Sequence, residues 1–408
     1  MARRTHIRIP AGPGRFTPAE DVFVSVEALG GLALLGATIV ALVWANVAGD
    51  SYTDLWHTGL TIGIGDFSIS EDLQHWVNDG LMTLFFFVVG LEIKRELVDG
   101  ELRDPKTAAL PALAALGGMV VPAALYLALN TTELARDGWG IPVATDIAFA
   151  VGVLALLGPR IPKGLKLFLL TLAIVDDIGA ILVIAVFYSS GVSGRWLGGA
   201  VAALLLIFVL QRVGARSPFV YVLPGVLLWV CMFESGVHAT IAGVILGLVT
   251  PKQSWRGKPV LEQLEGALHP WTSFLIIPVF ALANAGVDLG GGVLGDALSS
   301  RITLGVIVGL VVGKTVGISG AVAIAVRFRL GRLPAGVHAR QILGAATLAG
   351  IGFTVSLFIA ELSFDDELLL GDAKIGILVA SVIAGVAGAL ILLKSNRKDG
   401  ARPRASGS

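Results

Sequence analysis

Cysteine and charge are what this sequence has least of. Cys231 is its single cysteine, which excludes an intramolecular disulfide and any metal site built from several cysteines. Only 15% of the 408 residues are charged, against roughly 25% in a typical soluble protein. The 30 basic and 30 acidic residues cancel, so nothing implies a nucleic-acid partner, and we expect no cofactor. The basic start leads into an apolar run without a convincing signal-peptide cleavage site.

Apolar residues are what the sequence has in excess. They make up 55% of the chain, the mean hydropathy is +0.82 and there are 52 glycines, as expected of closely packed membrane helices. We predict an all-α polytopic membrane protein with a transport domain over residues 24–393, between cytoplasmic tails at 1–23 and 394–408. About twelve spans are expected, at residues 24–47, 76–97, 107–129, 138–157, 167–188, 195–211, 218–234, 236–250, 268–287, 302–326, 337–361 and 372–393.

The basic residues predict the orientation of these spans. If both termini lie in the cytoplasm, 25 of the 30 Lys and Arg residues fall in inner segments, and Lys314 lies within a span. Only four remain for the outer segments, which is the asymmetry of the positive-inside rule. We therefore expect an inner-membrane protein with both ends inside. The outer basic residues are Arg136, Arg195, Arg301 and Lys374.

One outer connection predicts a small β-hairpin. In Leu60–Ser70, Ile62 and Ile69 alternate with polar residues around a Gly65-Asp66 pair, a pattern typical of two short strands and a tight turn. A strand edge exposed in this way can pair with a second copy of the chain. A homodimer contact is the interpretation we favour, with a solvated loop as the alternative.

Two of the expected spans are predicted to be interrupted. Gly138–Leu157 contains Pro142, which lacks an amide donor and would stop or kink a helix, and the eleventh span contains Gly350 and Gly352. Irregular backbone at this depth is tolerated only inside protein or along an aqueous cavity, and such pairs mark transporter binding sites. Simple kinks are the alternative. The spacing also allows an inverted repeat of spans three to five and ten to twelve.

The fifth span carries two carboxylates at its centre. Asp176 and Asp177 are the tenth and eleventh of the 22 residues in Leu167–Tyr188. A charge at that depth costs about 2.5–3.5 kcal/mol on insertion scales. Neighbours on a helix point about 100° apart, so one narrow stripe cannot hide both. An ion or proton site is the default interpretation, and a structural pair satisfied by neighbouring donors is the alternative.

Further ionisable residues reach the same depth on other spans. Asp146 and Lys314 lie near the middle of the fourth and tenth spans, and Lys314 would pair with one of the carboxylates. The other carboxylate, with the Thr145 hydroxyl, offers oxygen ligands that suit a hard cation. Protons would compete for the same oxygens, because a low-dielectric environment raises a carboxylate's proton affinity. This competition is sufficient for cation/proton exchange at Asp177 and Asp176.

Three other functions remain to be weighed against exchange. A proton-coupled carrier of another small solute is disfavoured because no aromatic or arginine groups join the constellation. An intramembrane aspartyl protease is suggested by the GxGD string at Gly63–Asp66, but that string lies outside an apolar span and a short motif out of context is weak. A retinal pump with Lys314 as Schiff base would need seven spans. We expect a transporter and no enzyme.

Several long motifs resemble the NhaA family of sodium/proton antiporters. The resemblance extends from the first span to the twelfth and rests on FFFVVGLEIKREL (Phe85–Leu97), GWGIPVATDIAFAVGVLALLG (Gly138–Gly158), LAIVDDIGA (Leu172–Ala180), LHPWTSFLIIPVFALANAGV (Leu268–Val287), VGKTVGI (Val312–Ile318) and GIGFTVSLFIA (Gly350–Ala360). It implies twelve helices, two of them interrupted and crossing. It also implies electrogenic uptake of two protons for each sodium or lithium ion expelled, for sodium and pH homeostasis.

The resemblance also implies roles for single residues. Asp177 matches the principal cation- and proton-binding aspartate, and Asp176 matches its neighbour, which pairs with the residue matching Lys314. Asp146 and Thr145 match the interrupted-helix residues, where the aspartate offsets helix dipoles. Asp79 matches a buried carboxylate near the site. The cytoplasmic pH-sensing cluster of the family is matched by Glu92, Arg95, Glu96 and Glu265. Gly266 replaces a histidine of a strongly pH-responsive family member, which puts the pH profile in doubt.

Overall fold

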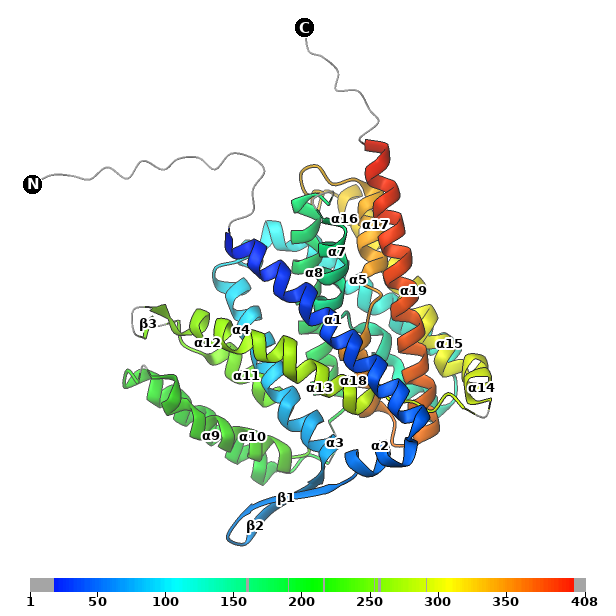
Figure 1. The fold of residues 1–408 in the computed structure, drawn as a ribbon. Coiled ribbons are helices and arrows are strands. Elements are labelled where there is room, and N and C mark those ends of the chain that lie inside the picture. The colour runs from blue at the N-terminus through cyan, green and yellow to red at the C-terminus, as the bar shows by residue number, and fades with distance from the viewer. Residues whose placement is uncertain are drawn as a thin grey trace, which may run out of the picture.

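The structure is a computed structural model that describes residues 18–399, apart from 159–160, 190, 216, 253, 256–257 and 291. Most of the predicted N-terminal tail and the end of the C-terminal tail lie outside this range. Helices pack side by side into one bundle, and a β-hairpin projects from one end (Figure 1). We call that end the hairpin face. The opposite end, where α8 begins and α16 ends, is called the basic face.

The part of the chain that the structure describes is mainly helical. Its α-helices are α1 (Pro18–Val47), α2 (Gly49–Trp56), α3 (Leu73–His75), α4 (Met82–Val98), α5 (Pro105–Leu129), α6 (Glu133–Arg136), α7 (Ile147–Leu156), α8 (Lys163–Phe187), α9 (Gly194–Arg212), α10 (Val222–Glu234), α11 (Thr240–Val249), α12 (Val260–Trp271), α13 (Ile277–Asn284), α14 (Val293–Ser299), α15 (Arg301–Ile307), α16 (Lys314–Arg327), α17 (Ala339–Leu348), α18 (Phe353–Ser363) and α19 (Glu367–Asp399).

Shorter elements complete the fold. The 3-10 helices are η2 (Glu101–Arg103), η3 (Asp137–Val143) and η5 (Pro218–Tyr221), and the π-helical turns are η1 (Trp76–Leu81), η6 (Thr272–Ile276) and η7 (Val308–Gly313). The strands form two antiparallel pairs, β1 (Gly59–Ile64) with β2 (Phe67–Asp72) and β3 (Ser254–Trp255) with β4 (Lys258–Pro259).

Length and apolar composition identify the membrane-crossing helices. Among the described residues, seven helices are long and apolar enough to cross a membrane, or up to nine if each of two bent pairs is one span. Two shorter apolar helices, Pro218–Glu234 and Thr240–Val249, and α4 coincide with the three other predicted spans. The polytopic helical class is therefore confirmed, whereas the count of twelve and the inverted repeat stay predictions.

Both predicted interruptions are present. The fourth span divides into Glu133–Val143 and Ile147–Leu156, bent by 44°, and the eleventh into Ala339–Leu348 and Phe353–Ser363, bent by 47°. Pro142 is the second-to-last residue of η3, with which the first of these halves ends at Val143. Gly350 and Gly352 lie in the break of the other pair.

The ninth span begins earlier than the sequence predicted. We expected it to start at residue 268, beside Pro270, but the helix runs continuously from Val260 to Asn284. Pro270 lies inside α12 and is followed at once by η6. A proline removes one backbone hydrogen bond and crowds the preceding turn. The wider turn of η6, directly C-terminal to Pro270, lets the helix continue past it, as π-helical turns within longer helices do.

The predicted hairpin is confirmed, with slightly longer strands. Its register pairs Gly59 with Asp72 and Ile64 with Phe67, so the loop consists of Gly65 and Asp66. Gly65 has a φ of +63°, which glycine adopts without steric cost and which two-residue hairpin turns require. The GxGD string therefore ends in the exposed turn of a hairpin, which does not suit an intramembrane protease.

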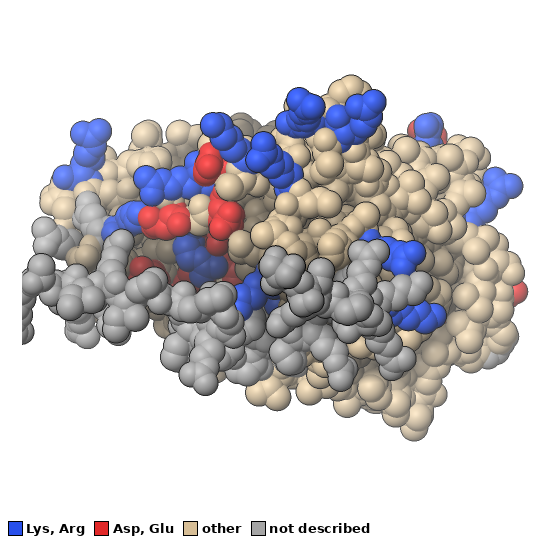
Figure 2. Space-filling model, turned by 90° about the horizontal axis from the view of Figure 1, so that it is seen from above, with Lys and Arg blue, Asp and Glu red and all other residues tan. Residues whose placement is uncertain are grey.

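Basic side chains gather at the end of the bundle opposite the hairpin. Figure 2 looks onto that end and shows many Lys and Arg side chains around a smaller acidic group. Lys94 and Arg95 lie near the end of α4, Lys163 begins α8 and Arg327 ends α16. Basic residues that are far apart in the sequence thus share one face of the bundle.

Glycines allow α4 and α11 to pack backbone against backbone. A Cβ atom on Gly90 would lie 2.6 Å from the carbonyl oxygen of Val244 and 3.1 Å from Gly247 Cα. Gly243 approaches Thr83 in the same way. Close contact through small residues is the usual basis of helix association in membranes, where lipid removes the hydrophobic drive. This contact fixes the position of α4, which lines the smaller of the two cavities described below.

We therefore expect Gly90→Ala to lower the apparent melting temperature of the detergent-purified protein. The added methyl group would press on the backbone of α11, and overpacking of this kind costs about 1–3 kcal/mol. Gly198→Ala on α9 is the matched control, because nothing lies within 4 Å of the Cβ it would add. Equal melting temperatures for the two variants would contradict the packing described.

Candidate functional site

The two central carboxylates lie inside the bundle on α8. Asp176 is 0% exposed and Asp177 is 5% exposed. Within the described part of the chain, Oδ1 of each has no hydrogen-bond partner. Buried polar atoms are nearly always paired, and a carboxylate oxygen accepts but does not donate when ionised. Two such oxygens on neighbouring residues form a site that a cation or protons would satisfy.

Lys314 neutralises one side of this pair. It is 0% exposed, and its Nζ lies 2.6 Å from Asp176 Oδ2 and also donates to the carbonyl oxygen of Val143. Val143 is the last residue of η3, so the ammonium group also meets the negative end of that half-helix. The predicted pairing is thus with Asp176, which leaves Asp177 without an ion-pair partner in the part of the chain that the structure describes.

Asp146 caps two half-helices at once. Its Oδ1 accepts a hydrogen bond of 3.0 Å from the amide of Phe149 in the first turn of α7, and its Oδ2 accepts one of 3.0 Å from the amide of Thr354 in the first turn of α18. The Thr354 hydroxyl donates to the same oxygen. Each helix N-terminus carries about half a positive charge, so the single carboxylate lies where it would compensate both.

The two interruptions touch each other through their backbones. The Asp146 amide donates to the carbonyl oxygen of Ile351 at 2.7 Å, and the Thr145 hydroxyl donates to that of Ala349 at 2.8 Å. Thr145 also interacts with the Asp176 carboxylate. These contacts satisfy polar groups that the broken helices would otherwise leave unpaired. The breaks therefore stabilise each other and bring Thr145, Asp146 and Asp176 together.

Close packing holds the interruptions in place. A Cβ atom on Gly350 would press against the carbonyl oxygens of Leu310 and Thr347, and one on Gly309 would lie 2.6 Å from Cβ of Pro142. The proline ring of the first break thus packs on a glycine of η7, directly before Lys314. This contact places the lysine beside the carboxylates.

A small cavity reaches the site from the side of the basic face. Its volume is about 60 Å³, enough for one or two water-sized occupants. Asp177, Asp146, Thr145 and Thr354 line it together with Glu92, Arg95 and His269. The Arg95 side chain is 32% exposed, so the lining continues to the surface. No group of three or more His, Cys, Asp and Glu residues in the described ranges is arranged to hold a metal ion.

Two of the predicted pH-sensing residues, Glu92 and Arg95, line this cavity, and the other two contact Arg95. Arg95 forms an ion pair with Glu265 on α12 and lies 3.7 Å from Glu96, and Glu92 lines the cavity. At Gly266, no atom lies within 4 Å of the Cβ that a side chain would add, so the space beside this backbone position is open. The four residues are brought together, and their part in pH response stays a prediction.

Asp79 lies elsewhere. It is on η1 and lines a second cavity of about 1120 Å³ at the hairpin face. The two cavities share no lining residue. The structure therefore places Asp79 and Asp177 at different cavities.

Two partners in the site were missed from the sequence. Thr354 binds Asp146 through both its amide and its hydroxyl, and the Val143 carbonyl oxygen accepts from Lys314. A threonine two residues after a pair of helix-breaking glycines is a signal that would have found Thr354. The carbonyl has no side-chain signal, because it is exposed only where the helix stops.

We expect Lys314→Ala to destabilise the folded protein strongly. Removing one member of a buried ion pair leaves an uncompensated charge and costs about 3–5 kcal/mol. Combining it with Asp176→Asn removes both charges and should recover part of the loss. Thermal unfolding of the purified variants would measure both effects. A single variant as stable as the parent protein would contradict the pairing.

Comparison with known proteins places these features in a family. The family model described as Na+/H+ antiporter 1 matches residues 21–392. The chain is 48% identical over 371 residues to "Na(+)/H(+) antiporter NhaA" of Escherichia coli (strain K12), covering 90% of this chain and 95% of that one. It is 45% identical over 429 residues to "Na(+)/H(+) antiporter NhaA 2" of Sorangium cellulosum (strain So ce56), covering 92% of each. This chain therefore belongs to the Na+/H+ antiporter 1 family.

Proposed function

We propose that this protein exchanges sodium for protons across a bacterial inner membrane, with Asp177 as the carboxylate for which the two ions compete. The observation that carries the proposal is the buried Asp177 Oδ1, which has no hydrogen-bond partner among the described residues and belongs to a residue that lines a cavity. The relatives named above as Na+/H+ antiporters support the same function. The chain would act as a transporter and perform no enzymatic reaction.

Sodium would be held by oxygen atoms alone. Asp177 and Asp176 each offer an Oδ1 atom without a partner in the described part of the chain, and Thr145 adds a hydroxyl beside Asp176. Oxygen donors of this kind suit a hard cation such as sodium or lithium. Because Asp176 Oδ2 is already bound to Lys314, Asp177 would supply most of the negative charge.

We infer that exchange proceeds by alternating access and that the structure is open toward the basic face. Asp177 lines the cavity on that side. On α18, Phe358 lies between Thr354, which lines this cavity, and Glu361, which lines the cavity of the hairpin face. Its buried ring lies 5.4 Å from Phe86 and 6.3 Å from Phe280, measured between ring centroids. Such a layer of packed rings would bar ions. The positive-inside rule makes the basic face, and with it both termini, cytoplasmic.

The proposed stoichiometry is two protons for each sodium or lithium ion. The adjacent carboxylates of Asp176 and Asp177 provide two proton positions within one buried site. Net movement of one positive charge per cycle would make exchange electrogenic, so the membrane potential would drive sodium export. This is the property needed for sodium and pH homeostasis, with Glu92, Arg95, Glu96 and Glu265 as the candidate pH sensors at the cytoplasmic mouth.

We also propose that the hairpin forms a homodimer contact. Among the residues that the structure describes, β1 and β2 pair only with each other, so one edge of each is available to a second copy. Trp76 anchors the hairpin to the second span by donating to the Leu60 carbonyl oxygen at 2.9 Å. A rigidly held strand edge is a suitable docking element.

We expect Asp177→Asn to abolish sodium-dependent proton movement in everted membrane vesicles, because the amide can neither release a proton nor attract a cation. Asp66→Asn in the hairpin turn is the matched control and should leave exchange unchanged. Asp176→Asn should impair exchange severely, since it leaves the buried charge of Lys314 without its ion-pair partner. Exchange retained by Asp177→Asn would remove this residue as the ion carrier and the proposal with it.

Competition predicts how sodium binding depends on pH. If one proton displaces one sodium ion at Asp177, the half-saturating sodium concentration should rise as the cytoplasmic-side pH falls. The limit is about tenfold per pH unit, as for any linked proton. Initial rates in proteoliposomes over a pH series would measure this. A half-saturating concentration that does not change with pH would contradict a shared site.

A further inference from the structure

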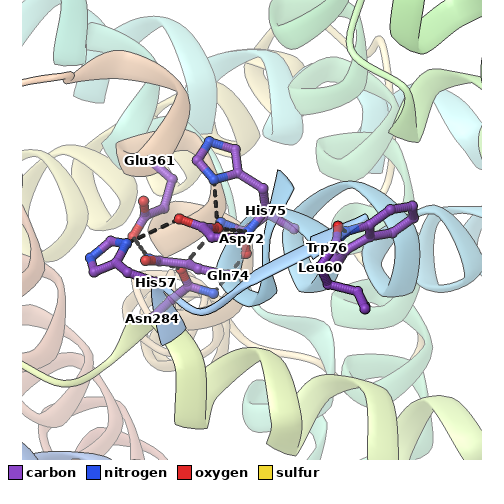
Figure 3. A network of polar contacts seen from close by, with 9 residues as sticks. His57, Leu60, Asp72, Gln74, His75, Trp76, Asn284 and Glu361 are labelled. Atoms are coloured by element: carbon purple, nitrogen blue, oxygen red, sulfur yellow. Dashed lines mark hydrogen bonds and ion pairs between the residues drawn. The ribbon is translucent and has the colours of Figure 1, made fainter. Parts of the chain in front are cut away.

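A polar cluster stands at the rim of the large hairpin-face cavity, far from the carboxylates on α8. Asp72 ends β2 and caps α3, accepting a hydrogen bond of 2.8 Å from the His75 amide. Its Oδ1 lies 2.7 Å from His75 Nδ1, and its Oδ2 lies 3.0 Å from His57 Nδ1. One carboxylate thus holds two imidazole rings that come from different segments (Figure 3).

Both rings can exchange protons with the solution. The side chains of His57 and His75 are 52% and 61% exposed, whereas that of Asp72 is 19% exposed. Burial alone would raise the pKa of Asp72, but the hydrogen bonds from His75 and His57 outweigh it and lower this pKa. Burial alone would lower the pKa of His75, but the hydrogen bond and charge of Asp72 outweigh it and raise this pKa.

Other charged groups face the cluster from neighbouring elements. Glu71 on β2 and Asp79 on η1 also raise the pKa of His75. Glu361 on α18 lines the same cavity and forms an ion pair of 2.7 Å with Lys374 on α19. The surroundings of His75 are therefore mainly acidic, which favours its protonated form.

Gln74 connects the cluster to the interior. It lies between Asp72 and His75 in the chain, and its Nε2 donates to Asn284 Oδ1 at 2.9 Å and to Glu361 Oε1 at 3.4 Å. Asn284 is fully buried and exchanges two hydrogen bonds with Asn78. Figure 3 shows Gln74 reaching from the cluster toward Asn284 and Glu361. The single turn of α3 thus has the histidine cluster on one side and the cavity floor on the other.

Glu361 belongs to the same half-helix that meets the transport site. The α18 helix begins with the contacts of Thr354 to Asp146, and Glu361 follows seven residues later, about 10 Å along the helix. A rigid half-helix therefore joins the floor of the cavity to the centre of the bundle. Whatever holds its Glu361 end restrains its Thr354 end as well.

We propose that His57, Asp72 and His75 form a proton-binding site at the outer mouth, which when protonated holds α3, Gln74 and α18 in the arrangement that closes this side. The proposal rests on the proposed function, in which the hairpin face is outer and access alternates. Protonated rings make charge-assisted hydrogen bonds to Asp72, roughly twice as strong as neutral ones. The additional hold on α3 is complete below the ordinary histidine pKa and is lost as the outer pH rises through the raised pKa of His75.

Proton binding can be measured on the purified protein without transport. Carbethoxylation modifies neutral imidazole, so mass spectrometry across a pH series yields a titration for each histidine. Asp72→Asn should shift the reactivity of His75 to lower pH and leave that of His238 unchanged, because His238 Nε2 contacts the Tyr188 carbonyl oxygen in the same cavity. An unshifted His75 profile would overturn the proposal.

Transport then tests the consequence. In right-side-out vesicles with a fixed lumen pH, isotopic sodium exchange should fall several-fold as the outer pH drops through the titration of His75. At every outer pH, His75→Gln should exchange sodium at the rate that the parent protein shows at high pH. His75→Lys, which stays charged, should exchange it at the rate that the parent protein shows at low pH. Protons competing at Asp177 affect all variants alike. If both substitutions act in the same direction, the role of His75 is structural and the proposal fails.

Gln74→Met separates sensing from transmission. It should flatten the dependence on outer pH while leaving the carbethoxylation profile of His75 unchanged, and His238→Gln should leave both as in the parent protein. A parent-like dependence in Gln74→Met would overturn the proposed link to α18. If the parent protein exchanges no sodium at any pH, the proposed function fails, whereas the titration of His75 still decides whether the proton site exists.

Discussion

The cost of placing charge in the interior of a membrane protein is the constraint on which this structure depends. Asp176 and Lys314 are both inaccessible to solvent and satisfy each other across two helices. The pair is strong only because other groups complete it, among them the Val143 carbonyl oxygen. Such an arrangement determines where α8 and α16 lie relative to the broken fourth span. It also leaves the neighbouring Asp177 to be satisfied by an ion from outside.

The broken helices solve a second electrostatic problem. Stopping two helices in mid-membrane exposes backbone donors and acceptors in a region without bulk water, where each unpaired group is costly. Asp146 accepts from the first turns of α7 and α18, and Thr145 donates to the end of the eleventh span's first half. The interruptions therefore cost less together than apart. Because of their contact, α18 extends from the transport site, at Thr354, to the cavity of the hairpin face, at Glu361.

Three π-helical turns lie where the chain lines a cavity or holds a charged group. Asp79 is within η1, η6 supplies Thr272 and Ser273 to the cavity beside Asp177, and η7 ends immediately before Lys314. A π-helical turn widens the helix and changes the direction in which following side chains point, and such turns are frequent at functional sites. Their sequences, WVNDGL, TSFLI and VGLVVG, share no common pattern that would predict them. They are a product of packing.

The class of the protein, the hairpin, the two interruptions and the common depth of Asp146, Asp176, Asp177 and Lys314 were determined by the sequence alone. Each of these follows from hydropathy, from turn residues or from the rise per residue, which are local properties. Only the tertiary structure decided that Thr354 joins Asp146, that α12 continues through Pro270 and that Asp79 faces the other cavity. These depend on how each helix is rotated and crossed against its neighbours. Spans that are apolar on every side carry little information about that rotation, because lipid and protein neighbours select similar residues.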